Sequence, residues 1–293
     1  MKRLLAAAIL CTFVVTAHAR SAADEAFENL AQEYISDLVN ISPAAATSIG
    51  DHSADGELDE VDADARAERA AIYKEYLAAL DRIDREQLSR ANKVDMELLR
   101  HQVSSSLWSL EVLQEWAWNP LVYVNLSGGS IYSLLARDFA PIEERLDNVA
   151  ARLEALPRFF EQARASLEPA RVPKIHAETA VSQTPGLLSI IEMMIVPEMD
   201  DLSPELQERL QAAIEVAKDA IAEQQTWLEE ELLPRANGEF RIGAELYDTK
   251  LAYALNSPLG RKEVKARAER EYENVRNQMY EIAKEVYAGV HPY

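Results

Sequence analysis

Apolar residues recur at steps of three and four positions through almost the whole chain, and this spacing constrains the fold more than any other feature. One such face is formed by Ile142, Leu146, Val149, Leu153 and Leu156. The run 264–286 repeats every seven residues, a period typical of helices that pack against other helices. Only nine of the 293 residues are glycines, so few positions interrupt a helix. The pattern predicts an all-α protein of long antiparallel helices in a bundle-like array.

Residues 115–141, EWAWNPLVYVNLSGGSIYSLLARDFAP, form one irregular aromatic segment between the helices. Pro120 predicts a break because a proline disfavours the helical conformation of the residue before it. The β-formers of 121–124 predict a short extended segment. Ser127-Gly128-Gly129-Ser130 predicts a sharp turn, either as a plain turn and cap or as a loop whose backbone N–H groups contact a ligand.

The amino terminus has the features of a secretory signal. Two positive charges precede an apolar run and the small-residue pattern Ala17-His18-Ala19, which predicts a signal peptide over 1–19 with cleavage after Ala19. The only cysteine, Cys11, lies inside this segment after Ile9-Leu10, whereas a lipoprotein signal has a small residue there. We expect residues 20–293 to be a helical domain that is periplasmic or secreted, without a membrane anchor after cleavage and stabilised by packing.

The acidic balance of the chain excludes some partners. Its formal net charge is -20, and nucleic acids and anionic membranes are both approached through basic patches. We therefore expect neither as a partner. The acidic stretch 51–64, which includes His52, is interpreted as a solvated loop, with a substrate-side lid or a metal site as alternatives. Its spacing does not match a calcium-binding loop.

No complete catalytic site is present in the sequence. The H-E-x-x-H zinc motif and the G-x-S-x-G nucleophile elbow are both absent. No cysteine remains after signal cleavage to act as a nucleophile. We therefore assign no catalytic and no metal-ligating residue, and any activity has to be inferred from relatives.

Several stretches together resemble one family. They are Ser42-Pro43 with Ala46–His52, VDMELLR at 94–100, NPLVYVNLSGGSIYSLLARDFAP at 119–141, IEERLDNVAARLEALPRFFEQARASL at 142–167, and the segments 245–255 and 258–279. In this order they resemble the amino-terminal half of the bacterial domain-of-unknown-function family eight-eight-five. The similarity extends over essentially the whole chain after the signal, although no single motif is as specific as a metal signature.

The resemblance implies an exported, all-helical protein similar to gluzincin-type zinc metallopeptidases, which enclose a peptide in a deep channel. In such proteins the zinc ligands lie in the carboxy-terminal half, so zinc is expected only for a full-length relative. The resemblance therefore implies a truncated or split amino-terminal half that forms one wall of the channel and is inactive alone. Its partners would be a peptide substrate or the missing carboxy-terminal half. The alternative is a free-standing periplasmic helical module that binds a peptide or another protein.

The channel interpretation also suggests which residues contact the substrate. They are Trp118, Asn119, Tyr123, Ser127, Gly128, Gly129 and Tyr132, with His52 on a nearby loop. A purely structural role is the alternative for each of them.

Overall fold

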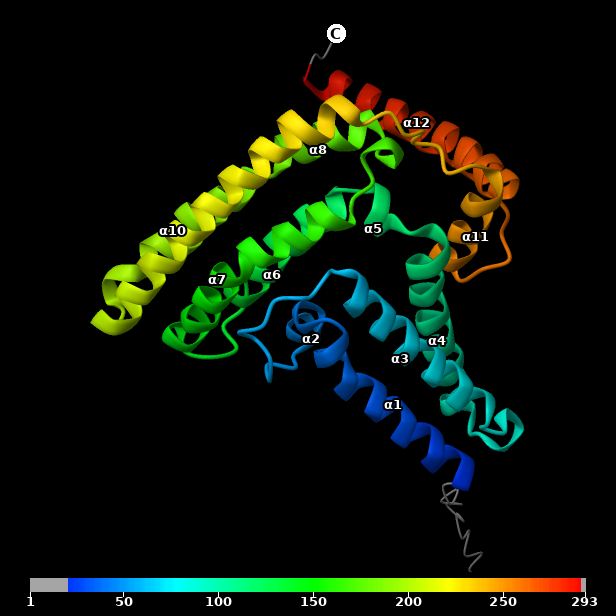
Figure 1. Ribbon diagram of the computed structural model, residues 1–293. Helices are drawn as coiled ribbons and strands as arrows, with labels where there is room; N and C mark the ends of the chain where they lie inside the picture. Colours follow the sequence, from blue (N-terminus) through cyan, green and yellow to red (C-terminus); the bar gives the residue numbers. More distant parts are fainter. Residues whose placement is uncertain (1–20, 291–293) are drawn as a thin grey trace, which may run out of the picture.

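The computed structural model describes residues 21–290, and every named element in this range is helical (Figure 1). The α-helices are α1 (Ala22–Ile41), α2 (Pro43–Ile49), α3 (Ala63–Asp81), α4 (Arg90–Trp108), α5 (Glu115–Trp118), α6 (Leu121–Leu135), α7 (Ile142–Ser166), α8 (Lys174–Gln183), α9 (Gly186–Ile190), α10 (Pro204–Trp227), α11 (Ala244–Leu255) and α12 (Arg261–Val290). The predicted all-α class is thus confirmed. The predicted signal peptide, with Cys11 and the cleavage site, lies outside the described residues.

Short irregular turns connect or extend these helices. The 3₁₀ turns are η1 (Arg85–Gln87), η3 (Pro169–Arg171), η5 (Val196–Asp201) and η7 (Leu233–Arg235). The π-helical turns are η2 (Ser109–Leu113), η4 (Ile191–Ile195) and η6 (Leu228–Leu232). Pro197 and Pro234 come just after η4 and η6. A proline has no N–H for the carbonyl four residues back, so the helix widens where it meets one.

The larger core lies between α6, α7 and α10, with α8 and α9 packed against them (Figure 1). Leu146, Val149, Leu153 and Leu156 of α7 are completely buried, which confirms the face predicted from their spacing. Ile142 at the start of this face is partly buried. Completely burying a leucine contributes roughly 2 kcal/mol, so this stripe holds α7 in the centre of the layer.

The smaller core joins α1, α3 and α4. Tyr34 and Tyr76 meet edge to face, with ring centroids 5.1 Å apart, and the Tyr76 hydroxyl donates to the Asp37 carboxylate at 2.6 Å. Ile41 and Val103 are buried beside them. The helices around these two cores form two packed layers, both visible in Figure 1, and α11 and α12 belong to neither core.

One helical run, Lys174–Asp201, is long and apolar enough to cross a membrane by length and composition among the described residues. Core helices pass the same test. Leu187, Ile191 and Ile195 of this run are buried in the larger core, whereas Ile175, Met193 and Val196 are exposed.

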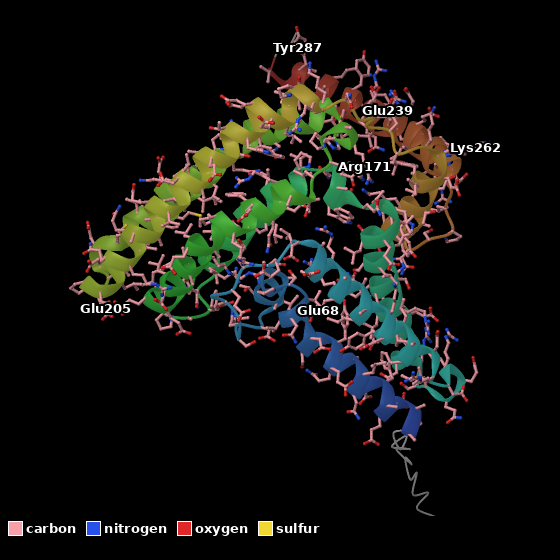
Figure 2. All side chains as sticks on the ribbon, in the orientation of Figure 1. Glu68, Arg171, Glu205, Glu239, Lys262 and Tyr287 are labelled. Atoms are coloured by element: carbon pink, nitrogen blue, oxygen red, sulfur yellow. The ribbon has the colours of Figure 1, made fainter. Side chains whose placement is uncertain are left out.

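Helix α11 is held against α4 by Tyr253. The His101 ring donates through Nε2 to the Tyr253 carbonyl at 2.9 Å, and the Trp108 and Tyr253 ring centroids are 5.5 Å apart. Helix α12 follows, with no buried residue. Figure 2 shows Lys262 and Tyr287, near its two ends, at the outer edge of the molecule. Its exposed large apolar residues are Tyr272, Val275, Met279, Tyr280, Ile282, Val286, Tyr287 and Val290.

Three sequence predictions need correction: the extended segment 121–124, the turn at 127–130 and the solvated loop 51–64. The segment 121–124 is helical, and α6 continues through Ser127-Gly128-Gly129-Ser130 without a turn. Burial of one face of α6 against α7 decides the conformation, since β-propensity depends strongly on context.

The stretch 51–64 is also not simply a solvated loop, because Asp55 and Asp59 are 3% and 2% exposed. Asp55 accepts from the Thr47 hydroxyl at 2.6 Å, and Asp59 accepts from the backbone of Ala44 at 3.1 Å.

Asp24 fixes the first turn of α1 to the start of α4. Its carboxylate accepts the Ser89 backbone N–H at 2.8 Å, the Asn92 side-chain amide at 2.7 Å and the Ser21 hydroxyl at 2.9 Å. The Ser89 hydrogen bond is the largest cause that holds the pKa of Asp24 well below its usual range, and those from Asn92 and Ser21 add to it. The ionised carboxylate therefore stabilises the folded state.

We predict that Asp24→Asn lowers the free energy of unfolding at pH 7. A pKa lowered by folding stabilises the protein fully above about pH 5, and this contribution is lost as the pH falls below about 4. The difference between wild type and variant, measured by urea unfolding, should therefore shrink from pH 7 to pH 3. Asp95→Asn, on the exposed side of α4, is the control and should change little. An equal difference at both pH values would contradict the prediction.

Candidate functional site

The connection between α4 and α6 is fixed by two tryptophans. Gln114 has a left-handed conformation with φ 54°, which turns the chain after η2 and leaves carbonyls without helical partners. The indole N–H of Trp116 donates to the Leu110 carbonyl at 2.9 Å, and that of Trp118 donates to the Leu113 carbonyl at 2.9 Å. The aromatic cluster recognised in the sequence therefore sets the position at which α6 begins.

Tyr123 connects this turn to the core. It is 3% exposed, and its hydroxyl donates to the Trp116 carbonyl at 2.7 Å. Its ring packs edge to face on Phe159, with the centroids 6.2 Å apart. Burial raises the pKa of the Tyr123 phenol, so the group is a neutral donor at physiological pH.

A groove of about 480 Å³ lies along α6 and is closed by α7, α8, α9 and α10. Five of the residues predicted from the sequence line it: Tyr123, Ser127, Gly128, Gly129 and Tyr132. The other lining residues are Pro120, Val124, Asn125, Phe160, Gln183, Thr184, Gly186, Leu187, Ile190, Gln224 and Leu228. The structure therefore brings most of the predicted residues to one place, on the face of a helix and not in a turn.

The groove carries no charged side chain among these lining residues, although 27% of the chain is charged. Its walls are aromatic and aliphatic, from Phe160, Leu187 and Ile190. Its polar groups are neutral, and include the side chains of Asn125 and Gln183. Such a lining suits an uncharged ligand that presents both apolar groups and amides.

The glycine pair is not required by the backbone or by packing. Neither glycine has a positive φ, since the described glycines that do are Gly50 and Gly243. A Cβ on Gly128 would touch Ile190 at an ordinary 3.8 Å, and one on Gly129 would meet nothing within 4 Å. A glycine inside a helix costs about 0.5–1 kcal/mol relative to alanine. What the pair provides in return is open space in the groove.

The remaining predicted residues lie elsewhere. Trp118 and Asn119 line a separate pocket of about 680 Å³ between α5, α8 and α11. There Trp118 stacks on His176, with the centroids 5.7 Å apart, and burial lowers the pKa of His176. His52 lines neither cavity. Its ring stacks on the Phe139 ring, with the two centroids 3.7 Å apart, and its Nδ1 is 2.9 Å from the Asp55 carboxylate.

Sequence reasoning missed the far wall of the groove. Gln183, Thr184, Ile190 and Gln224 lie 50 to 100 positions beyond the glycine pair along the chain, and nothing in their local pattern relates them to α6. Within residues 21–290 no group of three or more histidine, cysteine, aspartate or glutamate residues is arranged to hold a metal ion.

The fold and the groove define an all-helical protein with an uncharged cleft, and comparison with known sequences places it in a family. The sequence profile of the bacterial proteins of unknown function called DUF885 matches residues 43–291. The chain belongs to this family, which confirms the resemblance seen in the sequence. No protein of curated function matches the chain.

A solved structure supports the same fold. It is a protein of unknown function from Shewanella oneidensis that is described as a lipoprotein, with 27% sequence identity and a TM-score of 0.76. The match covers 91% of this chain and 49% of that protein. The chain thus spans about half the length of this relative.

We predict that Gly129→Ala raises the free energy of unfolding by about 0.5–1 kcal/mol, because the position is helical and has room for a methyl group. Gly238→Ala is the matched comparison and should be destabilising, since its Cβ would overlap the Arg171 carbonyl beside the bridge to Pro173. Urea unfolding of both variants measures the effects. A destabilised Gly129→Ala would show that the glycine is needed for packing and not for space.

Proposed function

We propose that this chain forms the amino-terminal helical wall of a peptide-binding channel in an exported protein similar to zinc metallopeptidases. The groove along α6 would hold a peptide segment in this channel. The chain would contribute binding without a catalytic zinc site, and zinc would belong to the polypeptide that forms the opposite wall. The channel and the likeness to metallopeptidases come from the family resemblance.

The observation that carries the peptide-binding part is the glycine pair in an uncharged groove. Gly128 and Gly129 weaken α6, yet neither φ nor packing requires them. Tyr132 at the mouth of the groove is 52% exposed, so an aromatic ring is available beside the open space. Peptides present apolar side chains and amide groups together, which matches the aromatic and amide side chains of the lining.

Two further observations support an opposite wall. The exposed apolar face of α12 includes Met279, Ile282 and Val286, each more than 60% exposed, and such faces mark sites covered by other polypeptide. The Shewanella oneidensis relative is about twice as long as the matched region. Export is supported by the signal-like amino terminus and by the description of that relative as a lipoprotein.

We predict that the purified chain binds a pool of short, uncharged peptides that are acetylated at the amino end and amidated at the carboxyl end. Gly129→Leu should weaken this binding by about tenfold or more, because the leucine side chain would occupy the groove. Leucine is a strong helix former and the Cβ position is open, so the variant should fold. Fluorescence anisotropy of labelled peptides measures the affinity.

The matched control is Gly289→Leu in α12, where a Cβ also meets open space. This variant changes a helical glycine far along the chain from the groove and should bind peptides like wild type. Equal binding by wild type and Gly129→Leu would overturn the groove as the peptide site.

A separate prediction tests the split-half part of the proposal. The DNA directly downstream of this coding sequence should encode an H-E-x-x-H segment, in frame or after a frameshift, because the opposite wall would supply the zinc ligands. Sequencing the genomic region gives the answer. An unrelated gene there would contradict a split or truncated peptidase, and the alternative, a free-standing peptide-binding module, would then be the better description.

A further inference from the structure

Within residues 21–290, two arginines on α3 form no ion pair with a carboxylate. Arg66 donates to the Val61 carbonyl at 2.6 Å and to the Ser166 hydroxyl at 2.8 Å. Arg69 donates to the carbonyl oxygens of Ala65, at 3.3 Å, and of Glu60. Among the ion pairs formed within residues 21–290, neither guanidinium takes part, although the chain has a net charge of -20.

Both arginines line a pocket of about 300 Å³ beside the start of α6. The hydroxyls of Ser106 and Ser109 lie in the same lining, from α4 and η2. The acid of this lining is Glu115, and its carboxylate is 2.7 Å from the Lys250 ammonium. The positive charge of the pocket therefore remains available to a ligand.

The positive charge of Arg69 opposes that of Arg66, and the carboxylate of Asp62 offsets part of this repulsion. Arg66 is held over the Trp116 ring, 4.0 Å from its centroid, which stabilises the cation through the aromatic face. Burial lowers the pKa of Arg66, and the nearby charge of Arg69 lowers it further, while Tyr123 and Asp62 raise it. A bound anion would remove this repulsion and use the N–H groups that are still free.

The rest of the pocket indicates what kind of anion fits. Val122 and Leu126 add apolar side chains to the lining, beside the Trp116 ring that lies under Arg66. A fully hydrated inorganic ion gains nothing from these side chains, whereas an organic acid with an apolar body uses them together with the arginines. Arginine forks bind carboxylates with two parallel hydrogen bonds.

We propose that Arg66 and Arg69 form a binding site for the carboxylate of a small apolar organic acid, either a free acid or the carboxy-terminal residue of a peptide. Tyr123 lines both this pocket and the groove along α6. The peptide source rests on the proposed function, since a peptide in the groove would then present its carboxyl end to the arginines. The free-acid source does not depend on it.

The test compares matched acids and amides on the full chain. N-acetyl-leucine should raise the thermal unfolding midpoint of the protein, and N-acetyl-leucinamide should not. In anisotropy measurements, peptides with a free carboxylate should bind about tenfold or more tightly than the same peptides amidated, the effect expected of a charge-assisted hydrogen-bond pair. Arg69→Gln should abolish the difference between acid and amide in both the unfolding midpoint and the peptide affinity. Arg69→Lys should restore part of each difference.

Arg100→Gln is the control, because Arg100 is an arginine on α4 that pairs with Asp81 at 2.6 Å, away from the pocket. It should leave both differences unchanged. A midpoint shift by N-acetyl-leucine without any preference for peptide acids would assign the site to free acids. Equal effects of acid and amide, or inorganic phosphate competing as well as the acid, would overturn the site. If the capped peptides still bind through the groove in that case, the proposed function stands without this site.

Discussion

The buried guanidinium of Arg152 links α7 to both α6 and α2. Its side chain is completely buried, and it donates to the Ser130 carbonyl of α6 at 2.5 Å and to the Thr47 hydroxyl of α2 at 2.7 Å. Burial lowers the pKa of Arg152, and the carboxylates of Asp55 and Asp59 oppose this effect. A buried cation without such partners is strongly destabilising. The acidic stretch 51–64 is therefore folded inward because α7 places a positive charge beneath it.

A second set of contacts joins α7 to Val61 and Arg66 and positions both candidate sites. The Gln162 side chain accepts the Val61 backbone N–H at 2.8 Å, and Arg66 reaches Ser166 on the same helix. Tyr123 of α6 lines both the groove and the arginine pocket. Its phenol is neutral and its hydroxyl already donates to the Trp116 carbonyl, so it is a fixed part of both linings and not an acid or base.

Most of the fold could be predicted from the sequence, because the buried stripe of α7 and the break at Asn119-Pro120 are local signals. The conformation of 121–130 could not, since a short apolar run suits a strand or a helix equally until its neighbours are known. The buried acids were missed for the same reason: Asp55 reads as a loop residue, but its partner Thr47 also accepts from Arg152, which lies 105 positions further along the chain. Five of the eight predicted site residues share the groove, because aromatic and small residues on one face of α6 remain close together whichever local conformation is assumed.

Helix α12 and the groove differ in what they need from other polypeptide. The seven-residue repeat of α12 is typical of packed helices, yet Met279, Ile282 and Val286 are exposed, and the proposed opposite wall would cover them. The walls of the groove, by contrast, come from α6 to α10 of this chain. Among residues 21–290, no residue of α12 lines the groove or takes part in the hydrogen bonds of Arg152. Peptide binding in the groove therefore does not depend on completion of a channel. The proposed binding and the proposed channel are physically separable.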